Sequence, residues 1–251
     1  MTDRSPSGKG EVLLSISHLS KSFGGVAAVK DVSFTVGHRE IVGVIGPNGA
    51  GKSTLFNAVT GFDRPDSGNV VFDGTNVDGM PPNRRAKIGL CRTFQTSQPF
   101  VELTVEDNVV IGALQQVGTV KEAKVLAASM LERVGLESFA QLKSGVLSLG
   151  NRRRLEVARA LATGPKLLLL DEVMGGLTPA EVDTVMELIA GLPADGVSVI
   201  LIEHIMRAIM TVSDRIVVMH DGNHIAEGVP DVIAKDPTVI AAYLGEEYAF
   251  A

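Results

Sequence analysis

The feature that most constrains this chain is a glycine-rich loop between an apolar run and a helical segment. The run Ile41–Ile45 is short and continuously apolar, as in a buried parallel strand. The pattern G-x-x-x-x-G-K-S follows it at once, and we expect a helix from about Lys52 to Thr60. Glycines let the backbone wrap around a phosphate chain with its N–H groups inward, and the helix N-terminus adds partial positive charge. We therefore predict a triphosphate-binding loop. Its residues are Gly46, Pro47, Asn48, Gly49, Ala50, Gly51, Lys52, Ser53 and Thr54.

Two side chains of this loop have specific expected roles. The Lys52 ammonium should reach the β- and γ-phosphates, and the Ser53 hydroxyl should ligate Mg²⁺. An ordinary glycine-rich turn before a helix is the alternative. The strand before the loop and the helix after it favour phosphate binding.

Two acidic residues, Asp171 and Glu172, directly follow the apolar run of residues 167–170. In a phosphate-loop enzyme, the ends of the strands line the crevice beside the loop. We expect Asp171 to hold Mg²⁺ through its water shell, and Glu172 to orient and polarise the attacking water as a general base. An apolar strand that ends in two acids is, taken alone, more often a surface transition. The phosphate loop favours the catalytic interpretation.

Strands and helices alternate along most of the chain. We expect strands at residues 12–16, 32–36, 41–45, 69–72, 167–170, 197–202 and 215–219, and helices at about 52–60, 179–190 and 205–212. This alternation predicts an α/β fold with a mostly parallel sheet covered by helices. From about Thr104 to Thr163 the pattern is helical, with Thr104 as an N-terminal cap. We expect this block to be an insertion into one compact domain.

Composition narrows the class of partner and the location. The formal net charge of −6 argues against non-specific binding of nucleic acid, which uses a basic face. The single cysteine, Cys91, fits a reducing compartment and is expected to be a small core residue. No apolar run approaches the roughly 20 residues of a membrane span, and residues 1–11 lack the apolar region of a secretory signal. We expect a cytoplasmic protein that reaches a membrane only through partners.

The stretch Leu147-Ser148-Leu149-Gly150-Asn151, with the helical segment after it, is similar to the L-S-x-G-Q signature of ABC transporter nucleotide-binding subunits. The resemblance covers nearly the whole chain. It implies a P-loop NTPase (ABC ATPase) core, an N-terminal antiparallel β subdomain and an inserted α-helical subdomain. It also implies hydrolysis of ATP with Mg²⁺.

The resemblance implies a division of the chain and a second subunit. Residues 1–251 would be a single nucleotide-binding domain, with the core and β subdomain at about 11–95 and 164–230, the helical subdomain at about 96–163, and a helical tail at about 230–251. Ser148 and Gly150 lie at a helix N-terminus, which can bind an anion. By resemblance they cap the γ-phosphate of ATP held by an opposing ATP-binding subunit, identical or paralogous.

Three further residues match positions of the family. Gln95 resembles the Q-loop glutamine, which contacts Mg²⁺ or the attacking water and senses the transmembrane partner. His204 resembles the switch histidine, which contacts the γ-phosphate. Phe23 is similar to the aromatic residue that stacks on adenine. Alone, a histidine after a strand is usually structural, and an aromatic residue at a strand end usually belongs to the core.

A narrower resemblance comes from residues 92–95, 103–108 and 241–245, which look like those of branched-chain amino acid importer ATPases. It implies permease subunits as partners, a solute-binding protein as an indirect partner, and a peripheral place on the inner face of the membrane. The transported solute would be a branched-chain or other hydrophobic amino acid or a related small solute. The alternatives are an exporter or lipid-transport ATPase, a soluble ABC ATPase acting on ribosomes or DNA, and a nucleotide-binding scaffold without turnover.

The chain departs from the family pattern at four positions. Val173 stands where proline is usual, and Thr178 where aspartate or asparagine is usual. Asn151 replaces the signature glutamine, and Ile205 stands where aspartate is common. None of these changes removes an expected phosphate or Mg²⁺ ligand. The change at Thr178 bears on communication between the two ATP sites.

Overall fold

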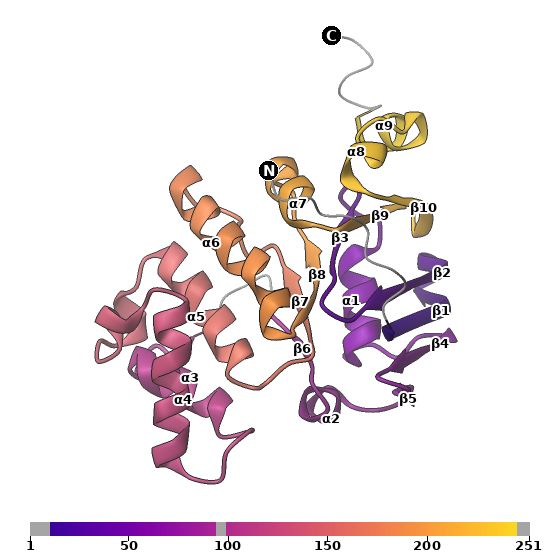
Figure 1. Cartoon of the computed structure of the whole chain (residues 1–251). Helices are drawn as coiled ribbons and strands as arrows, with labels where there is room; N and C mark the ends of the chain where they lie inside the picture. The colour runs from indigo at the N-terminus through magenta and orange to yellow at the C-terminus, as the bar shows by residue number, and fades with distance from the viewer. Residues whose placement is uncertain (1–10, 94–98, 245–251) are drawn as a thin grey trace.

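The computed structural model describes residues 11–93 and 99–244 (Figure 1). The strands are β1 (Val12–Phe23), β2 (Val26–Gly37), β3 (Ile41–Ile45), β4 (Ser67–Phe72), β5 (Thr75–Asn76), β6 (Leu90–Arg92), β7 (Leu167–Asp171), β8 (Ser198–Ile202), β9 (Arg215–His220) and β10 (Asn223–Gly228). The α-helices are α1 (Lys52–Thr60), α2 (Pro82–Lys87), α3 (Val105–Ala113), α4 (Val120–Arg133), α5 (Leu149–Leu161), α6 (Pro179–Gly191), α7 (Met206–Val212), α8 (Pro230–Ile233) and α9 (Pro237–Leu244). Short 3-10 helices are η1 (Glu137–Phe139), η2 (Ser144–Val146) and η3 (Leu192–Asp195). Across the described ranges, no helix has both the length and the apolar character needed to cross a bilayer.

A six-stranded sheet forms the centre of the molecule, in the order β10-β9-β3-β8-β7-β6. All neighbours in it are parallel except β10, which pairs antiparallel with β9. The strands β3, β7 and β8 are buried along their whole length, which explains their continuous apolar sequences. In the register of this sheet, Ile202 pairs with both Val44 and Asp171. The carboxyl ends of β3, β8 and β7 therefore lie level at one edge, and the predicted mostly parallel sheet is confirmed.

A second sheet, antiparallel, has the order β2-β1-β4-β5. It shares a core with α1 and with one face of the central sheet. Members of this core include Leu14, Val36, Phe56, Val70 and Leu169. This arrangement confirms the predicted N-terminal antiparallel β subdomain.

The other face of the central sheet packs against the helices of the second half of the chain. Alternate residues of its strands, such as Leu168 and Leu201, join Val182 and Ile189 of α6 and Ile209 of α7 in one apolar cluster. The central sheet is thus buried on both faces, as parallel sheets require.

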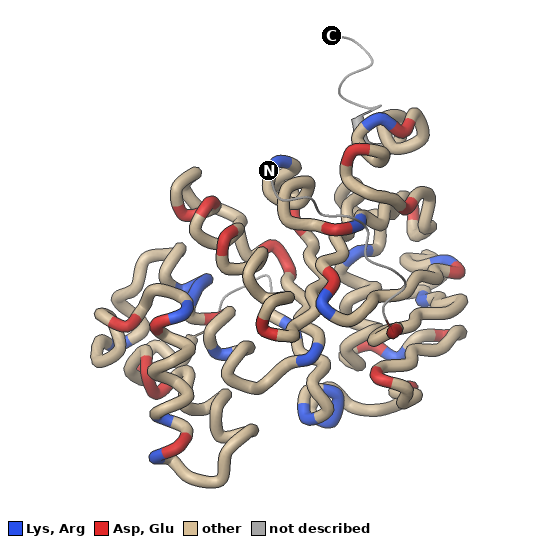
Figure 2. Tube along the Cα trace, viewed as in Figure 1, with Lys and Arg blue, Asp and Glu red and all other residues tan. Residues whose placement is uncertain are grey.

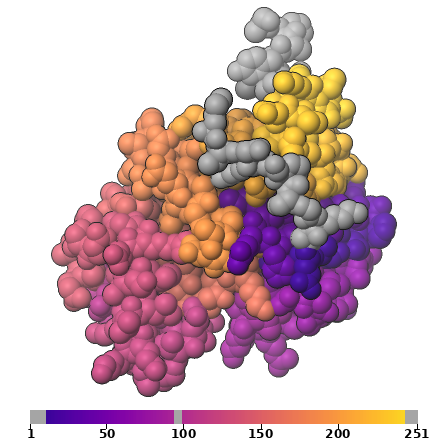
Figure 3. Space-filling view, viewed as in Figure 1, coloured from indigo at the N-terminus to yellow at the C-terminus, as the bar shows by residue number. Residues whose placement is uncertain are grey.

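The inserted helices α3, α4 and α5 pack around a core of their own, which includes Val109, Leu131 and Leu155. Thr104 caps α3 by accepting the Asp107 N–H, as the sequence predicts. Figure 3 shows this block as a separate lobe, with a hollow between it and the lobe that carries the N-terminal sheet. The inserted helical subdomain is therefore confirmed.

The two sheets are joined by hydrogen bonds from a few residues. Arg215 of β9 donates to Glu40 through Nε (3.0 Å) and to the Thr35 carbonyl through Nη2 (2.7 Å), and it also pairs with Glu227 of β10. A backbone link runs from the Lys30 N–H to the Gly222 carbonyl (2.7 Å) and from the Gly222 N–H to the Ala50 carbonyl (3.1 Å). The second sheet is thereby attached to the phosphate loop through Gly222.

A buried arginine attaches α2 to the end of α1. Figure 2 shows basic residues gathered on α2, and Arg85 is the buried member of this group. Its Nη1 donates to the carbonyls of Ala58 and Val59, and its Nε donates to that of Met80. A cation at a helix C-terminus is stabilised by the unpaired carbonyls there. Arg85 therefore fixes the C-terminal end of the helix that begins at the phosphate loop.

Several expected strand boundaries were wrong. β2 begins at Val26 rather than at Val32, and β4 begins at Ser67 rather than at Asn69. β1 continues to Phe23, because register shifts after Ile16 let a more polar segment stay paired. Asp171 is the last residue of β7, paired with Ile202, rather than the first residue after the strand.

Candidate functional site

The phosphate loop begins where β3 ends, and its glycines are required by their surroundings. Gly46 has a φ of 154°, and a Cβ there would lie 2.1 Å from the Met219 carbonyl oxygen. Gly51 has a φ of 97°, and a Cβ there would lie 2.1 Å from the Ala28 carbonyl oxygen. The backbone of this loop is thus pressed between neighbouring strands, and only glycine fits at either position.

The loop curls around its own lysine. The Lys52 side chain is buried, with 6% of the residue exposed, and its Nζ donates to the carbonyls of Gly46 (2.7 Å) and Pro47 (2.9 Å). Burial lowers the pKa of Lys52, whereas Glu172 and Asp171 act to raise it. The ammonium is therefore held at the centre of the loop, within electrostatic reach of both acids.

Helix α1 starts at Lys52 with an N-terminus suited to an anion. Its N-cap is Gly51, and the first turn has no side-chain cap and no acidic residue. Ser53, the next residue, is exposed. Amides of an uncapped first turn and the helix dipole together attract phosphate.

Asp171 lies beside this loop as a buried carboxylate, with 3% of the residue exposed. Its Oδ2 accepts a hydrogen bond from Arg92 Nη2 at 3.1 Å, and Arg92 Nη1 also donates to Asn57 Oδ1 of α1 at 2.6 Å. Burial raises the pKa of Asp171, Arg92 opposes this, and Glu172 adds to it. The other oxygen, Oδ1, is buried and has no hydrogen-bond partner among the described residues.

That orphaned oxygen fits a hydrated Mg²⁺. A buried carboxylate oxygen normally has a partner, and Mg²⁺ keeps several waters that can donate to one. In the described part of the chain, no group of three or more His, Cys, Asp and Glu residues could cage a metal. Mg²⁺ in nucleotide sites is held by one or two side chains together with the phosphates, so the absence of such a cage among the described residues is compatible with the expected ligands Ser53 and Asp171.

Glu172 and His204 form a hydrogen-bonded pair at the same edge of the sheet. His204 follows β8 and Glu172 follows β7, and these strands are neighbours. His204 Nε2 lies 2.6 Å from Glu172 Oε1, and an ionised carboxylate can only accept, so the imidazole N–H donates. Glu172 has a φ of 49°, which is uncommon for a residue with a side chain. Its backbone N–H is fixed by the Ile202 carbonyl at 2.9 Å.

Ser148 and Gly150 do not join this cluster within the chain. Ser148 caps α5, and its Oγ accepts the Asn151 N–H at 3.3 Å. Figure 1 shows α5 and α1 apart, with β7 and β8 between them. A Cβ on Gly150 would lie 2.2 Å from Glu181 Oε1 of α6, so the signature turn is packed against the start of that helix.

The remaining predicted residues have other surroundings. Phe23 ends β1 with 47% of its surface exposed, and Lys21 Nζ lies 5.2 Å from the centroid of its ring. Gln95 lies outside the described residues.

The departures from the family pattern have structural counterparts. Thr178 is the N-cap of α6 and forms a capping box with Glu181, which is the role that aspartate or asparagine would have. Ile205 is the N-cap of α7. Its side chain makes no capping hydrogen bond, whereas an aspartate at this position could make one. Val173 is fully buried, and Asn151 Oδ1 accepts a hydrogen bond from Arg154.

Sequence reasoning did not single out Arg92, Thr93 or Glu203. Thr93 Oγ1 accepts the Asp171 N–H at 3.3 Å, and Glu203 accepts a backbone N–H beside Glu172. The only signal for Glu203 was an acid placed between an apolar run and the histidine. Arg92 had none, because its partner lies 79 residues away.

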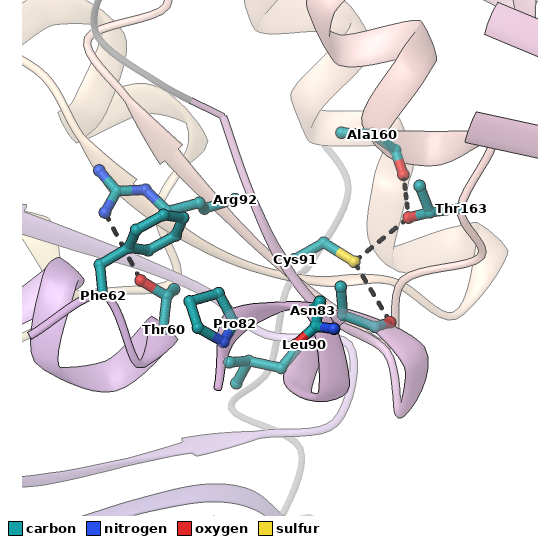
Figure 4. A pocket seen from close by; sticks show the side chains of 10 residues that line it. Thr60, Phe62, Pro82, Asn83, Leu90, Cys91, Arg92, Ala160 and Thr163 are labelled. Atoms are coloured by element: carbon teal, nitrogen blue, oxygen red, sulfur yellow. Dashed lines mark hydrogen bonds between the residues drawn. The ribbon is translucent and has the colours of Figure 1, made fainter. Parts of the chain in front are cut away.

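A cavity of about 350 Å³ lies elsewhere, among α2, β6 and the ends of α1 and α5 (Figure 4). Phe62, Pro82, Leu90 and Cys91 contribute to its largely apolar wall, and Arg92 lies at one side. Cys91 is buried, as expected, with its Sγ 3.2 Å from Thr163 Oγ1. This cavity is distinct from the phosphate loop.

Comparison with known proteins agrees with the geometry. The family described as "ABC transporter" matches residues 29–175, and the family described as "Branched-chain amino acid ATP-binding cassette transporter" matches residues 224–249. The high-affinity branched-chain amino acid transport ATP-binding proteins BraF of Pseudomonas aeruginosa and LivG of Escherichia coli K12 are each 41% identical, over 93% of this chain and 98% of theirs. The crystal structure of a nucleotide-free ATP-binding cassette from an ABC transporter superposes with a TM-score of 0.84, at 31% identity, and covers 92% of this chain and 98% of its own.

Proposed function

The chain belongs to the ABC transporter family as an ATP-binding subunit, and we propose that it powers uptake of branched-chain or other hydrophobic amino acids, or related small solutes, through a membrane permease. It binds and hydrolyses ATP with Mg²⁺, as this family does. The identity to importer subunits and the match of the C-terminal segment support the choice of solute class. We place the protein at the inner face of the membrane, held there by the permease, with a solute-binding protein as an indirect partner.

One observation carries the assignment of the hydrolytic site. Lys52, Asp171, Glu172 and His204 converge at the carboxyl ends of three neighbouring parallel strands. The Lys52 ammonium is influenced by both acids, and Glu172 is bonded to His204. Phosphate-binding, metal-binding and proton-accepting groups are thus collected where an open α/β sheet binds its ligands.

The proposed roles follow from these positions. The amides of residues 46–54 and the Lys52 ammonium bind the phosphates of ATP. Ser53 and Asp171 would hold Mg²⁺, together with Gln95, and the bound ion shields the charge of the β- and γ-phosphates.

Glu172 orients the attacking water and accepts its proton. The His204 N–H keeps the Glu172 carboxylate directed toward the reacting phosphate, and the imidazole ring, by resemblance to the family, would contact the γ-phosphate. Catalysis is then mainly positioning and electrostatic stabilisation.

We propose that Ser148 and Gly150 act on the ATP of a second ATP-binding subunit. Within one chain α5 stands apart from the phosphate loop (Figure 1). The N-terminus of α5 can bind an anion, and that anion would come from a second subunit. A facing subunit, identical or paralogous, would bring its bound ATP to this turn. The exposed ring of Phe23 would stack on adenine, and residues 1–251 would act as one nucleotide-binding domain with the divisions given above.

Two substitutions at the site test this function. In Glu172→Gln, we expect ATP affinity to stay close to that of the wild type while turnover falls by about a hundredfold or more, because the general base is lost. In Lys52→Ala, we expect ATP affinity to fall by at least about tenfold, because a charge-assisted contact to phosphate is removed.

The measurements are ATP binding, phosphate release and uptake of labelled leucine by cells that carry the variant in place of the wild-type chain. Both variants should abolish uptake. Wild-type turnover in Glu172→Gln would refute its role as base. If cells that carry either variant still take up leucine, isoleucine and valine at the wild-type rate, the proposed solute class is refuted.

A further inference from the structure

A buried acid that has no assigned role lies directly beside the Glu172–His204 pair. Glu203 follows β8 and has only 1% of its surface exposed. Its Oε1 accepts the backbone N–H of Met174 at 2.8 Å. These residues are 29 positions apart in the chain, so the bond joins the segment after β7 to the segment after β8.

The segment that Glu203 holds is the one that sets the direction of Glu172. The chain adopts a φ of 49° at Glu172 and then turns into Val173 and Met174, both fully buried. In this turn the Met174 N–H is aimed at the Glu203 carboxyl group rather than at a backbone carbonyl. A left-handed conformation at a residue with a side chain persists only where its surroundings enforce it.

Three hydrogen bonds therefore join the segment after β7 to the end of β8 and the segment after it, at the carboxyl ends of these strands. The Glu172 N–H donates to the Ile202 carbonyl at 2.9 Å, His204 Nε2 donates to Glu172 Oε1 at 2.6 Å, and Glu203 accepts the Met174 N–H. The contact made by Glu203 is the one that fixes the chain on the far side of Glu172. The other hydrogen bonds at this turn start from Glu172 itself: its N–H and side chain bond to the end of β8 and the segment after it, and its carbonyl accepts the Gly175 N–H at 3.3 Å within the turn.

We propose that Glu203 is a positioning residue for hydrolysis: its buried carboxyl group holds the Met174 amide and thereby fixes the Glu172 turn opposite His204. Glu203 does not reach the phosphates in this role, and it acts through Glu172. The inference rests on the proposed roles of Glu172 and His204. It extends them by naming the contact that holds Glu172 in position opposite His204.

The cost of burying this acid supports a specific use for it. Burial raises the pKa of Glu203 to about 7, the N–H groups of Met174 and His204 oppose that rise, and Glu172 adds to it. Burying a charged group costs free energy, so a buried acid is weak evidence for a stabilising role. An acid at this position is therefore explained better by the orientation of the Met174 amide than by the stability of the fold.

Two substitutions distinguish the effect of the Glu203–Met174 hydrogen bond from the effects of the charge and the volume of the Glu203 side chain. Glu203→Gln keeps a carbonyl oxygen that can accept the Met174 N–H, and Glu203→Met fills a similar volume without an acceptor. Ser198→Ala is the matched control, because Ser198 lies at the other end of β8, is fully buried, and accepts the Arg39 N–H at 2.8 Å. It removes an equivalent buried acceptor far from the catalytic edge.

The test uses the full chain and measures kcat, KM, the Kd for ATP, and amide hydrogen exchange of the nucleotide-free protein. We expect Glu203→Met to lower kcat by about tenfold or more through misplacement of Glu172, with the Kd for ATP within about threefold of the wild type. Exchange in residues 172–176 should be about tenfold faster, with α1 unchanged. Glu203→Gln should restore kcat to within about threefold, and Ser198→Ala should leave kcat unchanged.

Three results would overturn the proposal: wild-type kcat in Glu203→Met, an equal loss of kcat in Glu203→Gln, or an equal loss in Ser198→Ala. If Glu203→Met does not fold, Glu203→Gln is compared with Ser198→Ala instead. Because glutamine keeps the acceptor for the Met174 N–H, Glu203→Gln must keep the wild-type amide exchange and kcat, and a loss of either refutes the proposal. Glu172→Gln is measured alongside. Retained turnover in that variant refutes the proposed base, whereas lost turnover there with wild-type kcat in Glu203→Met refutes only the role of Glu203.

Discussion

Asp171 and Glu203 are both buried acids near the phosphate loop, but their surroundings differ. Asp171 is paired with the Arg92 guanidinium at 3.1 Å, whereas Glu203 accepts from the neutral amide of Met174. Burial raises the pKa of both residues, and that of Glu203 reaches about 7. The ionisation of Glu203 in the folded chain therefore changes near neutral pH.

This difference predicts how the stability of the protein depends on pH. Between the ordinary pKa of 4.5 and about 7, folded Glu203 keeps a proton that the unfolded chain has lost. The contribution of Glu203 to stability is therefore present below pH 4.5 and is lost as pH rises through about 7. We expect Glu203→Gln, which cannot ionise, to gain about 2 kcal/mol over the wild type between pH 5.5 and pH 8.

Urea unfolding at pH 5.5 and pH 8 measures this gain, and Ser198→Ala serves as the control because it removes the two hydrogen bonds of a buried hydroxyl without changing ionisation. An identical pH dependence in Glu203→Gln and the wild type would show that Glu203 does not titrate in this range.

At the scale of elements, the start of α6 is fixed by a capping box. Thr178 Oγ1 accepts the Glu181 N–H, and Glu181 Oε2 accepts the Thr178 N–H at 2.9 Å. The other carboxylate oxygen, Oε1, occupies the space that a side chain on Gly150 would need. One acid therefore connects the start of α6 with the signature turn at the start of α5.

We expect Thr178→Ala to destabilise the fold by about 1 kcal/mol, since the cap is lost, and Thr178→Asn to remain within about 0.5 kcal/mol of the wild type. Thr119→Ala is the control, because the Thr119 side chain also caps a helix, α4: its Oγ1 accepts the Glu122 N–H and donates to the Glu122 carboxylate. Chemical denaturation gives the free energies of unfolding. Both alanine variants should lose similar stability, and only Thr178→Ala should also speed exchange at the N-terminus of α5. Unchanged exchange at α5 would refute the connection through Glu181.

Local elements were more accessible to sequence reasoning than contacts between them. The phosphate loop and α1 were predicted with the observed bounds, because strand, loop and helix are contiguous and the glycines are locally required. By contrast, β6 has three residues and β10 is only partly buried, so neither shows a periodic pattern. The carboxylates of Asp171 and Glu172 were found from their place after an apolar run. His204, the partner of Glu172, was named only through the family resemblance, and Arg92, the partner of Asp171, was not found, because pairing across the sheet decides both contacts.

At the scale of the whole molecule, Arg215 joins the central sheet to the antiparallel sheet. We expect Arg215→Gln to lower the free energy of unfolding by about 2 kcal/mol, because Glu40 and Glu227 lose a partly buried partner and the Thr35 carbonyl loses a donor. Arg207→Gln is the control. Arg207 pairs with Asp183 on the surface, where both side chains are more than half exposed, and its loss should change stability by less than about 0.5 kcal/mol. Urea unfolding of both variants at one ionic strength tests the difference, and equal effects would show that Arg215 is no more than a surface ion pair.

The link from Lys30 through Gly222 to Ala50 has a consequence for the choice of nucleotide. The strand that follows Phe23 and the loop that surrounds Lys52 are bound to the same glycine, so they belong to one rigid frame. Backbone hydrogen bonds therefore hold the segments that carry the proposed stacking ring and the ammonium at a set separation. A molecule that is too short to reach from one to the other gains only one of the two contacts, so this frame selects ligands by length as well as by charge.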